Sequence, residues 1–184
     1  MRYCVISTIM NLISRILPIL ILLVGLVLPV SPLRAADDIT DRENKIKIAY
    51  LFHFSQFTEW AIKPTVFTYC VYDDEHFSEL LKRSYVNKML GESKVNVIPI
   101  DAQSNLDNCQ LVYFPNAISA ELLARIRKKP ILSVGGQKNI LEQGIIYLFE
   151  EDEKVRFFIN NSSAIAAGLK ISSQLLSLSK EPSL

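Results

Sequence analysis

The sequence predicts a single α/β domain of three layers, with a mostly parallel sheet, crossover helices and an antiparallel hairpin at one edge. Three observations indicate this fold. Strand-like and helix-like segments alternate through the middle of the chain. Two strand-like runs then flank an acidic turn. An apolar helical pattern precedes the first strand-like segment, and another follows the last. Such alternation is typical of parallel strands joined by crossover helices.

The first predicted helix begins at Thr40, because Thr40–Glu43 fits a capping box in which the two side chains satisfy each other's backbone N–H groups. Apolar residues recur at helical spacing as far as Phe57, and Pro64 should end the helix after about Trp60. Further apolar residues lie off this stripe. A helix that is apolar on more than one face is buried on two sides or contacts a partner.

Strands and helices then alternate as far as residue 134. The predicted strands are 67–72, 95–100, 109–114 and 131–134, and the predicted helices are 75–85 and 119–128, the second capped by Ser119. The next two strand-like runs, 144–149 and 155–159, flank the acidic turn 150–154. This pattern predicts the antiparallel edge hairpin.

The C-terminal segment from Ser162 onward predicts one amphipathic helix with two apolar stripes. One stripe starts with the small residues Ala164 and Gly168, which would let another backbone come close. The two stripes either pack on the sheet and on the first helix, or form a surface for a partner. Asn160 and Asn161, which precede the helix, are residue types that commonly cap one.

Residues 1–36 have the pattern of a secretory signal peptide. An uncharged apolar run lies between Arg15 and Arg34, with Arg2 also on its positive flank and Ala35-Ala36 near a cleavage point. An uncleaved anchor is the alternative, because the run is close to the shortest that spans a bilayer, but its prolines favour cleavage. Cleavage leaves residues 37–184 as one exported domain that is not inserted directly in the membrane.

The charge of this domain argues against some classes of partner. The signal holds three arginines and no acidic residue, so 17 basic and 19 acidic residues remain and the net charge is −2. This balance gives no electrostatic reason to bind nucleic acid or anionic lipid. We therefore expect no nucleic-acid partner and expect recognition by shape and apolar contact.

Two cysteines remain after removal of the signal. Cys70 and Cys109 each lie in an apolar, strand-like run. Because exported proteins meet an oxidising compartment, the pair predicts a disulfide bond. Two buried free thiols are the alternative, since unpaired cysteine is among the most buried residue types.

The sequence does not group the residues that catalysis or metal binding requires. Neither His53 nor His76, the only histidines, has a ligand at metal-site spacing. Gly135-Gly136 lacks the Lys and Ser/Thr of a phosphate loop and is interpreted as a turn. Asp73-Asp74 follow the first strand but have no base or orienting partner nearby. We predict no catalytic residue, metal or cofactor, and hence a protein that is not an enzyme.

The segment KIAYLFHFSQFTEW, residues 47–60, resembles the opening block of the YfiR-like family of periplasmic proteins. Strand runs 69–72, 109–114 and 131–134 and the segment 156–176 resemble its remaining blocks in order, so that the resemblance covers residues 45–179. It implies a small periplasmic α/β domain, often a homodimer. Such a domain would bind the periplasmic sensor region of an inner-membrane diguanylate cyclase, repress cyclic-di-GMP synthesis and so limit biofilm growth.

The chain departs from some members of this family in its hairpin region. Gly144 and Glu151 occupy the region in which those members have a second pair of cysteines. We therefore do not expect redox control through such a pair in this chain.

The resemblance and the surplus of apolar residues on the first and last helices together predict where a partner would bind. The predicted surface comprises Phe158, Asn160, Asn161, Ile165 and Leu169. Its apolar members would be the anchors at the centre of the interface.

A small-molecule-binding module of a periplasmic signalling or uptake system is the alternative function. Open α/β sheets bind ligands at the carboxyl ends of their strands, so the ligand would occupy a crevice near Asp73, Asp74 and Pro115-Asn116.

Overall fold

The structure is a computed structural model that describes residues 33–182, with side chains described from residue 40 onward. The predicted signal peptide lies outside these residues except for its last four, and it stays a prediction. Residues from Thr40 onward form one compact unit, and the fold below is that of this unit. Within the described part of the chain, no helix combines the length and the apolar character needed to cross a membrane.

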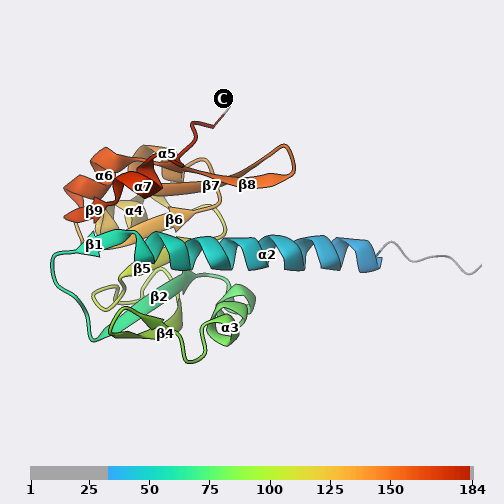
Figure 1. Cartoon of the computed structure of the whole chain (residues 1–184), viewed down its shortest axis with the longest axis horizontal. Helices are drawn as coiled ribbons and strands as arrows, with labels where there is room; N and C mark the ends of the chain where they lie inside the picture. Colours follow the sequence, from blue (N-terminus) through green and yellow to red (C-terminus); the bar gives the residue numbers. More distant parts are fainter. Residues whose placement is uncertain (1–32, 183–184) are drawn as a thin grey trace, which may run out of the picture. The chain divides into compact units, whose positions relative to one another are not determined.

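A seven-stranded mixed sheet forms the centre of the domain (Figure 1). Its strand order is β3-β4-β2-β5-β6-β7-β8; the five central strands are parallel, and β3 and β8 are antiparallel to their neighbours. The strands are β2 (Val66–Tyr72), β3 (Met89–Leu90), β4 (Ser93–Ile100), β5 (Leu111–Phe114), β6 (Leu132–Gly135), β7 (Ile146–Glu151) and β8 (Lys154–Ile159). The predicted parallel sheet with an antiparallel edge hairpin is confirmed.

Two apolar clusters cover the two faces of the sheet, because successive side chains of a strand point to opposite faces. Tyr69 and Val71 belong to one cluster, whereas Cys70 between them belongs to the other. Helices α2 (Leu33–Gln56) and α3 (Glu75–Ser84) supply buried residues to the first cluster, and α4 (Ala120–Ile126) and α5 (Ile140–Gln143) supply them to the second. The domain therefore has the predicted three layers.

Helix α2 differs from its prediction at both ends. The predicted cap at Thr40 is wrong, because the helix continues through this residue to Leu33. The helix ends at Gln56, and the chain then forms the short strand β1 (Thr58–Trp60). This strand pairs with β9 (Leu169–Ile171) in a separate two-stranded antiparallel sheet, so a long-range pairing ends the helix before Pro64 can.

The predicted single C-terminal helix is wrong. The segment forms a short helix α6 (Asn161–Ala166), strand β9 and a second short helix α7 (Ser173–Leu176). Gly168 separates the first two with a φ of +75°, and its N–H group donates to the carbonyl of Ile165. A left-handed glycine at this position stops a helix, so Gly168 serves as a helix terminator. The expected contact between close backbones does not occur there, because a Cβ added at Gly168 would meet nothing within 4 Å.

Replacing Gly168 should destabilise the domain through backbone strain. We expect Gly168→Leu to lower the free energy of unfolding by about 1–2 kcal/mol, because the left-handed conformation is costly for a residue with a Cβ. Gly168→Asn is the matched control, since asparagine tolerates this conformation. Denaturant unfolding of the two variants measures the difference, and equal stabilities would contradict this account.

Both outer strands of the sheet are protected against the addition of another strand. On β8, the Phe157 carbonyl accepts from the N–H of Lys180 (2.9 Å), and the Ile159 N–H donates to the Ser179 hydroxyl (2.8 Å). At the opposite edge the outer strand β3 is only two residues long, and Pro99 of the neighbouring β4 has no N–H to offer. Prolines and covering segments are common ways to close a sheet edge. We therefore expect partners to contact side chains and not to extend this sheet.

Candidate functional site

The structure places the residues of the predicted partner surface in one continuous segment but not on one surface. Ile165 is 65% exposed and Asn161 is exposed, whereas Phe158 and Asn160 are half-buried. Leu169 is only 3% exposed and belongs to the first apolar cluster. Leu169 is therefore a core residue of β9, and its predicted role as a surface anchor is wrong. The roles of the other four residues stay predictions.

Helix α6 shows why Ile165 is free to meet a partner. The helix buries Ala164 and is followed by the buried Ala167, and both contribute to the first cluster. Ile165 lies between them in sequence and points away from this core. The Asn160 side chain caps the helix by accepting from the Ser163 N–H at 3.0 Å. A large apolar side chain is thus held at the surface on a helix with a fixed start.

The acidic residues at the carboxyl end of β2 have structural roles. Asp74 is the N-cap of α3, and its carboxylate accepts from the N–H of Phe77 at 2.8 Å. Asp73 lies in the turn before this cap, with a φ of +50°. The cap contact accounts for Asp74 without a ligand, and Asp73 is a turn residue.

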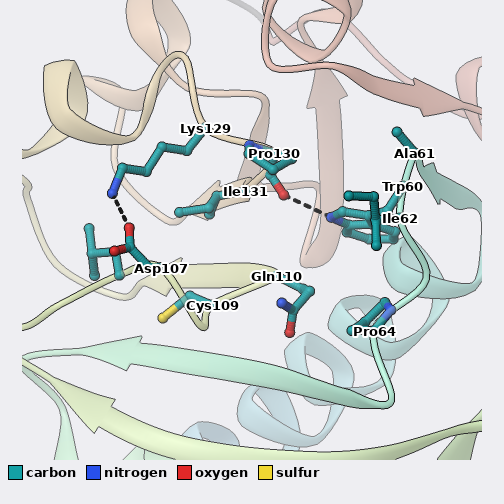
Figure 2. Close-up of a pocket in the computed structure, with 11 residues that line it drawn as sticks. Trp60, Ala61, Ile62, Pro64, Asp107, Cys109, Gln110, Lys129, Pro130 and Ile131 are labelled. Carbon is teal, nitrogen blue, oxygen red and sulfur yellow. Dashed lines mark hydrogen bonds and ion pairs between the residues drawn. The ribbon is translucent and has the colours of Figure 1, made fainter.

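A pocket of about 350 Å³ lies at the opposite, amino ends of strands β2, β5 and β6 (Figure 2). Its walls come from β1, from the connections that lead into β2 and β5, and from the residues before β6. Most of the lining is apolar. The lining residues are Trp60, Ala61, Ile62, Pro64, Leu106, Asp107, Cys109, Gln110, Lys129, Pro130 and Ile131.

Trp60 forms one wall of this pocket and is held in place at two points. Its indole N–H donates to the carbonyl of Pro130 at 2.9 Å, and its ring meets Phe67 edge to face with 5.0 Å between centroids. The sequence interpretation missed this role because it placed Trp60 at the end of a helix. The available signal was that the only tryptophan is followed by Ala61–Pro64, which continues no periodic pattern.

The polar groups of the pocket are an ion pair and an amide. Lys129 Nζ lies 2.6 Å from Asp107 Oδ1, and this hydrogen bond and the charge of the lysine lower the pKa of the Asp107 carboxyl. The side-chain oxygen of Gln110 accepts from the backbone N–H of Thr68 at 2.7 Å. The amide NH2 of Gln110 remains as a donor group of the pocket wall.

The predicted disulfide between Cys70 and Cys109 is confirmed, with 5.8 Å between the Cα atoms. Cys70 lies on β2, and Cys109 lies just before β5, the neighbouring strand. Cys109 also lines the pocket. The bond therefore fixes the connection between β4 and β5, which forms one pocket wall, to the centre of the sheet.

The buried tyrosines of the core have structural roles. Burial raises the pKa of Tyr69, Tyr85 and Tyr113 well above the ordinary tyrosine value, so their hydroxyls stay protonated at physiological pH. The Tyr85 hydroxyl donates to the carbonyl of Ile48 at 2.6 Å and ties α3 to α2. Among the described residues, no three His, Cys, Asp or Glu side chains are grouped so that they could hold a metal ion.

Comparison with known proteins gives one result for the whole domain. A search of curated proteins finds no match. A family model described as YfiR/HmsC-like matches residues 44–180, which include the disulfide, the pocket and the segment with Ile165. Because this match spans well over half of the sequence, the chain belongs to the YfiR/HmsC-like family.

Proposed function

We propose that this protein is a periplasmic regulator that binds the periplasmic sensor region of an inner-membrane diguanylate cyclase and represses cyclic-di-GMP synthesis. The observation that carries the proposal is the family match over residues 44–180. The YfiR-like family is periplasmic and regulatory, and it is known for controlling diguanylate cyclases. Repression would lower cyclic-di-GMP in the cell and disfavour biofilm growth.

The disulfide supports an exported location. Cys70 and Cys109 are both buried and bonded to each other. Disulfides of this kind persist in oxidising compartments such as the periplasm and are rare in the cytosol. The proposal includes cleavage of residues 1–36 and a homodimer as the form that meets the cyclase.

The exposed position of Ile165 supports a partner surface that includes Phe158, Asn160 and Asn161. Ile165 is one of the large apolar side chains that the described part of the domain leaves in water. Apolar anchors surrounded by polar groups are typical of interface centres, and the two asparagines beside β8 would supply such groups. Because both sheet edges are protected, a side-chain surface of this kind suits the domain better than strand addition.

Ile165→Asp should abolish repression. A charge at the centre of the interface should weaken binding of the cyclase by about thirtyfold or more, because loss of a buried anchor has this order of effect. The measurements are cyclic-di-GMP in cells that carry the cyclase and titration of the purified protein with the cyclase's periplasmic region. Val86→Asp is the matched control, since Val86 is 63% exposed on another part of the domain.

A second control is Glu153→Lys in the hairpin turn, which changes the charge of an exposed residue outside the predicted surface. Both controls should repress normally. The melting temperature of each variant, and the absence of free thiols in it, establish that it is folded. Full repression by a folded, exported Ile165→Asp protein would exclude this surface.

A further inference from the structure

We infer that the pocket at the amino ends of β2, β5 and β6 is a binding site for a small, uncharged, planar aromatic molecule that carries one hydrogen-bond acceptor. This inference is independent of the proposed partner. It also differs in place from the carboxyl-end crevice expected from the sequence, because the three strands of the central sheet that border the pocket, β2, β5 and β6, do so at their starts.

The size of the pocket sets the size of the ligand. An apolar cavity of about 150 Å³ in a protein holds one benzene molecule, and ligand pockets begin at about 300 Å³. The pocket here has about 350 Å³. It therefore has room for a molecule of one substituted ring or two rings.

The shape of the walls favours a planar ring. Trp60 is held by its hydrogen bond to Pro130 and by its edge contact with Phe67, so its indole is already oriented in the protein that holds no ligand. Figure 2 shows Trp60 and Ile62 on one side of the pocket and Ile131 across from them. A flat ring can stack against an indole at low entropic cost when the indole is already held in place.

The polar groups select a neutral ligand with an acceptor. Lys129 and Asp107 neutralise each other at the rim, so the pocket offers no unpaired charge to a charged ligand. The oxygen of Gln110 is used by Thr68, which leaves the amide NH2 to donate. A carbonyl or ether oxygen on the ligand would accept this hydrogen bond, whereas a charged group would lose its hydration without compensation.

An apolar side chain at the mouth of the pocket is not buried by the domain itself. Ile62 is 84% exposed and lies in the connection between β1 and β2. Large apolar groups in water at the rim of a concave site commonly mark a binding region. A ligand seated beside Trp60 would give Ile62 an apolar neighbour.

The test uses the purified exported protein and the uncharged fluorescent probe 6-propionyl-2-(dimethylamino)naphthalene, which has two fused rings and a carbonyl oxygen as acceptor. Trp60 is the only tryptophan, so energy transfer from its emission to the probe reports binding close to the pocket. We expect saturable transfer with one site per chain. Ile62→Asp should weaken probe binding by about tenfold or more, because it places a charge against the probe. Val86→Asp is the control, because it also replaces an exposed apolar residue by an acidic one. This variant should bind the probe as tightly as the wild-type protein.

Competition tests the acceptor. Acetophenone and α-methylstyrene have similar shapes, because a CH2 group of the second takes the place of the carbonyl oxygen of the first, so only acetophenone has an acceptor oxygen. Acetophenone should displace the probe about tenfold better, the effect of one hydrogen bond. Gln110→Glu should remove this preference, because it keeps the oxygen that Thr68 needs and loses the NH2 donor. Absence of saturable transfer, equal effects of Ile62→Asp and Val86→Asp, or an unchanged preference in Gln110→Glu would overturn the inference.

Discussion

Loss of the Cys70–Cys109 disulfide should lower the free energy of unfolding by about 3–4 kcal/mol. The bond joins residues that are 39 positions apart, so it removes much of the freedom of the unfolded chain between them. Both half-cystines are buried in the second apolar cluster, beside Val112 and Leu122. The bond also holds the segment before β5 against the sheet, and this segment packs Leu106 into the same cluster.

The double variant Cys70→Ala/Cys109→Ala measures this contribution, because it removes the bond without leaving a reactive thiol. Denaturant unfolding should be compared with the oxidised protein and with the wild-type protein held in reductant. The two forms without the bond should lose similar stability, which separates loss of the bond from loss of two sulfur atoms. A difference below 1 kcal/mol, or free thiols in the native wild-type protein, would contradict the prediction.

The sheet could be predicted from sequence because its signals are local. Most central strands are short apolar runs bounded by turn residues, although β4 also contains polar residues, and Asp74 and Ser119 cap the helices that follow β2 and β5. The hairpin of β7 and β8 surrounds an acidic turn that no buried strand would contain. The pairing of Cys70 with Cys109 could be predicted as well, since these are the only two cysteines outside the predicted signal peptide.

The C-terminal segment could not be predicted because two signals conflict. The apolar residues from Ala164 to Leu175 recur at helical spacing, and local propensity therefore favours one helix. The structure instead pairs Leu169–Ile171 with Thr58–Trp60, more than a hundred positions earlier in the chain. Gly168 is the one local sign of the break, but glycine in a helical pattern also suits a close helix contact. The pairing of β1 with β9 cannot be predicted from the sequence of either segment alone.

The pocket was missed for a similar reason. It is built from the starts of three parallel strands and from the Ala61–Pro64 connection, which meet only once the strand order is known. Before that, Trp60 and Gln110 are separated by 50 positions and share no motif. The residues of the predicted partner surface lie within one short segment, but the burial of Leu169 depends on the β1–β9 pairing and could not be predicted from that segment.

A second large effect is expected in the aromatic core under helix α2. Phe54 is 0% exposed, and its ring meets Tyr50 at 5.6 Å and Phe157 at 5.1 Å between centroids. These contacts join α2 to the edge strand β8. The Tyr50 hydroxyl adds a hydrogen bond to the Val155 carbonyl of the same strand. Phe54 is thus the centre of the packing that holds the helix to the hairpin side of the sheet.

Phe54→Ala should lower the free energy of unfolding by about 3–5 kcal/mol, because it removes a buried ring and leaves a cavity that a helix and a strand on either side cannot close. Denaturant unfolding with the disulfide intact measures the loss. His53→Ala is the matched control, since His53 is the exposed neighbour of Phe54 on the same helix turn, and surface changes of this kind stay within about 0.5 kcal/mol. Phe54→Leu should fall between them, because it restores part of the volume. If Phe54→Ala were no less stable than His53→Ala, helix α2 would not pack on the sheet through this ring.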